Sequence, residues 1–517
     1  MAELLRAVVE ARGPDAAALI DERGTLAWGE LDRRVNRCIH ALRGRGLGPG
    51  DRVAVLSTNR REYFEIFAAC AHSALLAVPV NWHLVAEEVR YILENSGARA
   101  LVVDPRFADL ACEATAGLGA LTVTALLGEE ETDCFELYED LLARASDDEP
   151  ADQGQGGPMF YTSGTTGHPK GVRRLGDLGS PVGNAQAASQ GFSMMTGAPQ
   201  GGVTLLCGPV YHSAQWAFSY LPLAGGSTVV MRHGFDPEES LRLIDEHSVT
   251  NVHLVPTQFV RLLRVAEETR VAFDGSSLKV VWHGAAPCPP DVKRRMIDWW
   301  GPVLTEYYGG TEGAIISLIS SQEWLERPTS VGRPVPIVEV SILDENGEPC
   351  PPGEPGQIFL RSMMATDFEY HGDTAKTAQA HREPGVFTMG DIGVLDDDGY
   401  LYLSDRKTDM IISGGVNIYP AEVERVLSEH EAVSDVAVFG IPDAEFGEQV
   451  KAVVEVVAGS AADDALAASL LKHCRDYLAG YKVPRSLDFA ELPRTETGKL
   501  QKRLLREPYW RDRERSI

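Results

Sequence analysis

The chain has 517 residues, of which 44% are hydrophobic and 24% are charged, so its composition is that of a globular protein that is too long for one hydrophobic core. We therefore expect two or more domains. Lysine and arginine number 48 against 75 aspartates and glutamates, and the net charge of −27 argues against general binding to nucleic acid or to an anionic membrane surface.

The N-terminus and the cysteines favour a cytoplasmic protein. Residues 1–9 lack the basic start, long apolar core and cleavage site of a signal peptide. No run reaches the roughly 18 apolar residues that span a bilayer, so we expect no integral membrane association. The eight cysteines are scattered without a CxxC pair, and we predict neither a zinc site nor a disulfide framework.

Helices and strands alternate in the first part of the chain. Apolar residues at 31, 35, 38, 39 and 42 form a helical stripe, and Arg52–Leu56 then has the pattern of a buried strand. The same alternation predicts helices at 62–71 and 87–93 and extended segments at 78–80 and 100–103. It is typical of parallel sheets covered by helices, and hence of an α/β fold.

A second α/β region follows the polar connector at 146–158. Its predicted elements are strands at 203–206, 227–231, 251–255 and 279–282 and helices at 237–247 and 258–267. The strands are apolar on both faces, as expected for buried parallel strands.

The pattern of predicted elements changes again in the last third of the chain. Residues 331–399 predict short strands separated by Pro, Gly and Asp, which indicates a small β-rich, barrel-like subdomain. A new α+β pattern starts after a charged stretch. We therefore predict an N-terminal domain at 1–404, a hinge at 405–409 and a small mobile C-terminal lid domain at 410–517.

The most informative motif is Tyr161-Thr162-Ser163-Gly164-Thr165-Thr166-Gly167-His168-Pro169-Lys170-Gly171. Its hydroxyls and backbone N–H groups can wrap an oligophosphate, because glycine lets the backbone approach an anion closely. Lys170 adds a positive charge. Pro169 stands where a Walker A loop has its second glycine, so the motif is not of that type. Composition alone also permits a flexible loop.

Three further motifs contain groups that suit a nucleotide. The turn Gly284-Ala285-Ala286 follows a predicted strand, where open α/β sheets bind ligands. Residues 306–312 combine aromatic rings that can stack on a base with glycines and a Thr/Glu pair, and the Glu312 carboxylate suits Mg²⁺. Asp391 can accept hydrogen bonds from ribose hydroxyls, and Arg406 can bind ribose and phosphate. Each motif alone has a purely structural explanation.

In this order the motifs resemble those of the adenylate-forming superfamily, which includes acyl-CoA synthetases, luciferases and peptide-synthetase adenylation domains. The resemblance covers roughly residues 25–505 and is to the fatty-acid–CoA ligase branch. It implies that ATP or AMP is bound by Thr162, Ser163, Gly164, Thr165, Thr166, Gly167, Lys170, Gly284, Ala285, Ala286, Glu306, Tyr307, Tyr308, Gly309, Thr311, Asp391 and Arg406.

The resemblance also implies catalytic roles for His212, Thr311, Glu312 and Lys499. Lys499 matches the lysine that binds the carboxylate and the α-phosphate, where negative charge accumulates during adenylation. The segment Ser413, Gly414 and Gly415 matches the pantetheine tunnel, which a thin thiol arm can pass because side chains are absent. Thr408 stands at the hinge about which the family rotates its C-terminal domain.

The acid-binding pocket is predicted from the same resemblance. Its expected lining is His212, Gln215, Trp216, Val255, His283 and Gly310. A hydrogen-bonded core histidine is an equal interpretation of His212. The variants at 282–289 and 307–312 look similar to ligases for fatty acids and for bulky polycyclic steroid or terpenoid acids, so we expect an apolar acid.

We therefore predict an AMP-forming acid–CoA ligase that uses ATP, Mg²⁺ and CoA. Transfer of AMP to the carboxylate creates a leaving group that the CoA thiol then displaces. Alternatives are transfer to a carrier-protein thiol, a branch member that performs mainly one half-reaction, and an inactive nucleotide-binding regulator. Thr408, Met389 and His168 depart from common family residues and leave the second alternative open. A homodimer also remains open.

Overall fold

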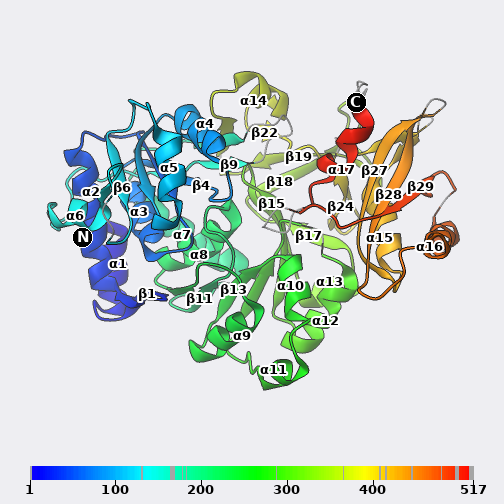
Figure 1. Ribbon diagram of the computed structural model, residues 1–517, viewed down its shortest axis with the longest axis horizontal. Coiled ribbons are helices and arrows are strands. Elements are labelled where there is room, and N and C mark those ends of the chain that lie inside the picture. The colour runs from blue at the N-terminus through cyan, green and yellow to red at the C-terminus, as the bar shows by residue number, and fades with distance from the viewer. Residues whose placement is uncertain are drawn as a thin grey trace.

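The predicted α/β architecture is confirmed (Figure 1). In this view the N-terminal domain, blue to yellow, forms most of the molecule, and the smaller orange and red part lies at its right. The computed structural model describes residues 3–129, 132–162, 169–176, 178–181, 183–286, 288–364, 366–406, 409–413, 416–443, 446–478, 480–494 and 500–511.

The first sheet is parallel and belongs to the N-terminal part of the chain. The elements of this part are α1 (Glu3–Arg12), α2 (Trp28–Gly44), β3 (Arg52–Leu56), α3 (Arg61–His72), β4 (Leu76–Val80), α4 (Ala86–Ser96), β5 (Ala98–Val103), η1 (Pro105–Phe107), α5 (Ala108–Thr115), β6 (Val123–Leu126), β7 (Glu136–Leu137), α6 (Tyr138–Ala143) and β8 (Gly157–Pro158). The strand order is β7-β6-β5-β3-β4-β8. Both faces of β3 and β4 are apolar and buried, as the sequence pattern predicts.

The second sheet has a parallel centre, β12-β11-β13-β14-β15. The elements around it are β1 (Ala17–Asp21), β2 (Gly24–Ala27), α7 (Gly183–Thr196), β11 (Val203–Leu206), α8 (Ser213–Ala224), β12 (Thr228–Met231), α9 (Pro237–Glu246), β13 (Asn251–Leu254), α10 (Pro256–Leu262), α11 (Glu267–Ala272), β14 (Val280–His283), α12 (Pro290–Trp300) and β15 (Leu304–Gly310). The prediction of a single helix at 258–267 is wrong, because the structure has two short helices there, α10 and α11. The α-helical bonding ends after α10, where the N–H groups of Arg264 and Val265 donate to carbonyls three residues back, as in a 3₁₀ turn.

The predicted β-rich part is continuous with this second sheet. Its elements are β16 (Ala314–Ser320), α13 (Ser321–Glu326), β17 (Ser330–Pro334), β18 (Val338–Leu343), β19 (Gly356–Ser362), β21 (His381–Glu383), β22 (Val386–Phe387), β23 (Asp391–Leu395) and β24 (Leu401–Arg406). Antiparallel pairing of β15 with β16, and then of β16 with β17, extends the sheet into this part. The site residues of both regions therefore sit on one hydrogen-bonded framework.

A three-stranded sheet joins segments that are far apart in sequence. It contains β9 (Phe160–Thr162), β10 (Lys170–Leu175) and β20 (Asp367–Tyr370), and α14 (Thr374–Ala380) follows β20. The strand β10 pairs with both others, so it lies between them and brings the predicted phosphate motif next to β20.

The C-terminal part forms its own sheet and helices. They are β25 (Ile411–Ser413), β26 (Val416–Ile418), α15 (Pro420–Ser428), β27 (Val433–Asp443), β28 (Gly447–Val456), α16 (Asp464–Tyr477), β29 (Ser486–Phe489) and α17 (Lys502–Trp510). The last strand of the N-terminal sheet, β24, extends to Arg406, so the predicted hinge at 405–409 overlaps the end of that strand. Thr408 lies outside the described residues.

One prediction from the cysteines is wrong. Cys112 on α5 and Cys134 form a disulfide across 22 residues of sequence, whereas the scattered spacing indicated no disulfide. The fold brings the two cysteines together, and no local sequence motif predicts that they lie close to each other.

Within the described ranges, no helix combines the length and the apolar character needed to cross a bilayer.

Candidate active site

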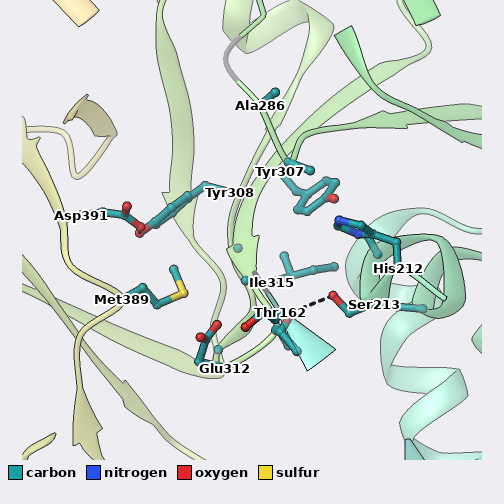
Figure 2. Close-up of a pocket in the computed structure, with 18 of the residues that line it drawn as sticks. Thr162, His212, Ser213, Ala286, Tyr307, Tyr308, Glu312, Ile315, Met389 and Asp391 are labelled. Carbon is teal, nitrogen blue, oxygen red and sulfur yellow. Dashed lines mark hydrogen bonds between the residues drawn. The ribbon is translucent and has the colours of Figure 1, made fainter. Parts of the chain in front are cut away.

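A cleft of about 4290 Å³ lies at the carboxyl ends of the parallel strands. It is bordered by both parts of the chain, because Tyr307 and Asp391 line it together with Arg425 and Leu500. Figure 2 shows the N-terminal wall, where side chains from β15, α8 and the β23 region point toward one another. Most of the predicted site residues that the structure describes are brought together here.

The two ends of the predicted phosphate loop face each other at the cleft. Thr162 ends β9, Lys170 begins β10, and the two residues are paired in the antiparallel ladder. Both line the cleft. Six of the loop residues between them lie outside the described residues: Ser163, Gly164, Thr165, Thr166, Gly167 and His168.

The predicted small-residue turn packs directly against β15. A Cβ atom on Gly284 would lie 2.6 Å from the backbone oxygen of Tyr307, so this close approach requires glycine. Ala285 has φ of +62°, which is rare for a residue with a side chain. Ala285 and Ala286 line the cleft, so the turn presents backbone and methyl groups to it.

The predicted ribose-binding residues are also brought together. The hydroxyl of Tyr308 donates to Asp391 Oδ2 at 2.6 Å, and Figure 2 shows the two side chains meeting. Asp391 and Arg406 are direct neighbours in the pairing of β23 with β24. The pairing of the two strands therefore brings Asp391 and Arg406 side by side, although they are 15 residues apart in the sequence.

Glu312, the predicted magnesium ligand, also lines the cleft. Its Oε1 accepts a hydrogen bond from the hydroxyl of Tyr370 at 3.0 Å. Nearby, Gly310 packs against Met389, since a Cβ atom on Gly310 would lie 2.5 Å from Met389 Sδ. The departure at Met389 thus lies inside the site, beside the predicted metal and acid positions. Gly309, in the same strand, packs closely against the neighbouring strand, since an added Cβ would clash with the backbone of Ala314.

Sequence reasoning missed a buried ion pair beneath this wall. Lys293 on α12 is fully buried, and its Nζ lies 2.5 Å from Oε2 of Glu306. Burial lowers the pKa of Lys293 and raises that of Glu306, while their mutual contact opposes both shifts. The available signal was a lysine on the apolar face of α12, next to Val292 and one turn before Met296.

The residues of the predicted acid pocket divide into two groups. His212, Trp216 and Gly310 line the cleft. Gln215, Val255 and His283 are not among its lining residues, and the side chains of Gln215 and His283 are buried. His283 is fully buried and packs against the ring of Phe259, so its side chain does not line the cleft.

A buried hydrogen-bonded chain supports the wall from behind. Gln215 Nε2 lies 2.9 Å from His253 Nδ1, and His253 Nε2 lies 3.0 Å from the hydroxyl of Tyr307. Burial and the nearby His212 lower the pKa of His253 to about 3, so its ring is neutral at pH 7. His253 was not among the predicted site residues.

The predicted residues of the C-terminal part fall partly within the described residues. Lys499, Gly414 and Gly415 lie outside the described residues, whereas Ser413 ends β25. Arg494 and Leu500, on either side of the lysine segment, both line the cleft.

Comparisons with known proteins match both parts of the chain to known families. The profile of the AMP-binding enzyme family matches residues 6–366, and that of the AMP-binding enzyme C-terminal domain matches residues 422–499. A feruloyl-CoA synthase from Amycolatopsis sp is 36% identical over 496 residues, covering 95% of both chains. The fatty acid–[acyl-carrier-protein] ligase ScoC from Streptomyces coeruleorubidus is 32% identical and covers 98% of this chain and 95% of its own.

A solved structure gives the same picture of the fold. The anthranilate CoA ligase AuaEII, in complex with anthranoyl-AMP, superposes with a TM-score of 0.87 at 25% identity, covering 98% of this chain and 96% of that one.

Proposed function

The chain belongs to the AMP-binding enzyme family and is an acyl-CoA synthetase of the adenylate-forming superfamily, and from this premise we propose that its acid is an apolar carboxylic acid. The observation that carries this proposal is an apolar wall beside His212. The wall consists of Phe192, Trp216, Tyr220, Leu221, Ile315 and Val335, all of which line the cleft.

Aromatic rings pack against one another in part of this wall. The rings of Trp216 and Tyr220 are stacked with centroids 5.3 Å apart, and Phe160 meets Trp216 edge-on. Burial of apolar area is worth roughly 25 cal/mol per Å², so a fatty or polycyclic hydrocarbon body gains more here than acetate does. The proposal keeps the predicted fatty and bulky polycyclic acids, adds aromatic acids, and excludes short polar ones.

The reaction has two steps. A carboxylate oxygen of the acid bonds to the α-phosphorus of ATP, the bond from that phosphorus to the β-phosphate oxygen breaks, and pyrophosphate leaves. The CoA thiolate then attacks the acyl carbonyl, AMP leaves, and the thiol proton passes to solvent. We assign Thr162 and Lys170 to the phosphates, Ala285, Ala286 and Tyr308 to the adenosine, and His212 to the acid carboxylate.

The remaining assignments follow from the family motifs. Asp391 and Arg406 are assigned to the ribose, and Lys499 to the carboxylate and α-phosphate in the first step. Ser413 belongs to the proposed thiol tunnel of the second step. The domain division at 405–409, which would let the C-terminal domain present both sets in turn, is part of the same proposal.

A magnesium ion suits the carboxylate at this site. Mg²⁺ prefers hard oxygen ligands and is often held by one or two carboxylates together with substrate phosphates and water. Glu312 lies in the cleft and its Oε1 already accepts one hydrogen bond, so its position fits such an ion. When bound, the ion would neutralise charge on the phosphate oxygens.

The test is a panel of acids with ATP, Mg²⁺ and CoA, scored by mass spectrometry of the CoA esters. We expect AMP, pyrophosphate and acyl-CoA, with kcat/KM for apolar acids roughly 100-fold above that for acetate, since four buried methylene groups are worth about 3 kcal/mol. Ile315→Trp should lower kcat/KM for bulky acids and leave ATP binding unchanged. Production of ADP, or preference for acetate, would contradict the proposal.

A second acceptor is favoured by one observation. The relative ScoC transfers a fatty acid to an acyl carrier protein according to its name. A carrier-protein thiol is therefore our second candidate, and a faster loading of a phosphopantetheinylated carrier than of free CoA would support it. The inactive-regulator alternative is no longer retained, because the chain is a ligase. A homodimer and a cytoplasmic location stay predictions.

A further inference from the structure

We propose that Lys376 is a second cation of the oligophosphate site and binds, together with Lys170, the β- and γ-phosphates of ATP and the pyrophosphate that leaves. This inference rests on the adenylation reaction described above. Lys376 belongs to none of the predicted motifs. The structure points to it because it lines the cleft beside the phosphate motif.

The position of Lys376 is fixed by the small three-stranded sheet. Tyr370 at the end of β20 pairs with Val172 of β10, two residues after Lys170. The chain then turns into α14, where the Asp373 carboxylate accepts a hydrogen bond from the N–H of Lys376 at 2.9 Å. The N–H of Tyr370 also donates to the Thr377 hydroxyl at 3.0 Å. These bonds tie the start of α14 to the strand that neighbours Lys170.

The surroundings of Lys170 connect the phosphate motif with the predicted metal ligand. Its Nζ lies 5.2 Å from the ring centre of Tyr370. The hydroxyl of the same tyrosine donates to Glu312 Oε1. Partial burial and the adjacent ammonium group of Lys376 lower the pKa of Lys170 to about 8, against the opposing attraction of Asp373 and Glu312. Both lysines line the cleft, and the pairing of β10 with β20 places the start of α14 beside the strand of Lys170.

Two adjacent ammonium groups repel each other, and one of them, Lys170, belongs to the predicted phosphate motif. Asp373 and Glu312 attract Lys170 and offset part of this repulsion. Lysine binds phosphate as a point charge. An oligophosphate between Lys170 and Lys376 would replace their repulsion by two attractive contacts.

The reaction gives this second cation a specific use. When the bond between the α-phosphorus and the bridging oxygen breaks, its electron pair goes to pyrophosphate. Negative charge then grows on the β-phosphate oxygens, and a positioned cation stabilises that charge in the transition state. Lys376 thus acts on the leaving group, whereas Lys499 is assigned to the opposite side of the α-phosphorus.

The test compares Lys376→Gln with Lys376→Arg and with Lys472→Gln as a matched control. Lys472 is an exposed lysine of α16 that pairs with Asp476. Titration calorimetry of the full chain at pH 7 measures binding of pyrophosphate, of ATP with Mg²⁺ and of AMP, and needs no acid substrate. A negative acid panel would therefore not affect this result.

We expect Lys376→Gln to weaken pyrophosphate binding about 10- to 100-fold, as for loss of a charge-assisted hydrogen bond. AMP binding should stay unchanged, which also shows that the variant is folded. Lys376→Arg should restore most of the affinity, and Lys472→Gln should match the wild type. Pyrophosphate affinity of Lys376→Gln within twofold of the wild type would overturn the proposal.

A pH series provides a second readout that a purely structural role would not change. Protonated Lys170 binds the anion, so in the wild type affinity should fall as the pH rises through about 8. Removing the positive charge of Lys376 raises the pKa of Lys170, so the fall should move to higher pH in Lys376→Gln. The same midpoint in both proteins would contradict a close pair of lysines.

Discussion

The hydroxyl of Ser213 lies 2.9 Å from that of Thr311. Ser213 is the first residue of α8, which contributes the apolar wall, and Thr311 directly follows β15. The hydrogen bond therefore joins the proposed acid wall to the turn that bears Glu312. Because the two residues are 98 positions apart in sequence, this contact couples two motifs that a linear reading treats separately.

Removal of this link should slow the reaction without unfolding the protein. A neutral hydrogen bond contributes about 0.5–1.5 kcal/mol, so we expect Ser213→Ala to lower kcat/KM for the acid roughly 3- to 10-fold. Steady-state kinetics with the best acid of the panel measures the effect. The exposed Ser276 offers a control, since Ser276→Ala should behave as the wild type. Unchanged kinetics in Ser213→Ala would show that the contact has no role in the reaction.

The buried pair of Lys293 and Glu306 leads to a prediction about stability. Lys293→Met leaves the Glu306 carboxylate buried without its partner, which typically costs about 3–5 kcal/mol. The double variant Lys293→Met/Glu306→Leu replaces the pair by apolar groups and should recover most of that stability, although ATP binding should be impaired. Urea denaturation measures the free energy of unfolding of the single and the double variant. A single variant within about 1 kcal/mol of the wild type would contradict an energetically important ion pair.

The sequence predicted the order of the nucleotide motifs because each depends on local residue types. Small residues at 284–286 and the strand before them give a turn at the sheet edge from local pattern alone. Lys293, His253 and Lys376 were missed for one physical reason. Each acts through a partner brought close by the fold, such as Glu306 for Lys293, 13 positions away, and no local pattern encodes such a partner.

The same reason explains why some residues of the predicted acid pocket do not line the cleft. Residues on successive positions of a motif point to opposite sides of the wall, so His212 and Trp216 line the cleft whereas Gln215 does not. The disulfide between Cys112 and Cys134 likewise depends on the packing of α5 against a later segment. Burial and sidedness follow from tertiary packing, which spacing alone did not supply.

The close packing of Gly284 against β15 can be tested with a single methyl group. In Gly284→Ala the Cβ would lie 2.6 Å from both the backbone oxygen and a ring carbon of Tyr307, so one of them must move. Overpacking of this kind costs about 1–3 kcal/mol, and we expect the KM for ATP to rise about tenfold. Gly44→Ala is the control, because nothing lies within 4 Å of its added Cβ. Equal KM values in the two variants would exclude a role for the close packing.

Buried histidines should make stability fall in mild acid. Burial lowers the pKa of His72 to about 4, below its value of about 6.5 in the unfolded chain. The unfolded state therefore binds more protons, and stability is lost as the pH falls from about 6.5 toward 4.

Proton uptake on unfolding measures this directly. At pH 5.5 in weak buffer, His72→Gln should take up about one proton fewer than the wild type. At pH 8, where the histidine is neutral in both states, the two proteins should not differ. The same uptake at pH 5.5 would mean that His72 is already protonated in the folded protein.

The last prediction separates the two half-reactions. Lys499 is assigned to the charge that develops between the carboxylate and the α-phosphate, and this charge exists only during adenylation. Lys499→Ala should therefore reduce ATP–pyrophosphate exchange by at least about 100-fold, equivalent to about 2.7 kcal/mol of transition-state stabilisation. Thioester formation from a supplied acyl-adenylate and CoA should proceed at nearly the wild-type rate. Lys472→Ala, at an exposed position of α16, should leave both steps unchanged. An equal loss of both steps in Lys499→Ala would refute a role confined to the first step, because the thiol attack breaks the bond between the acyl carbon and AMP and leaves the α-phosphorus bonds intact.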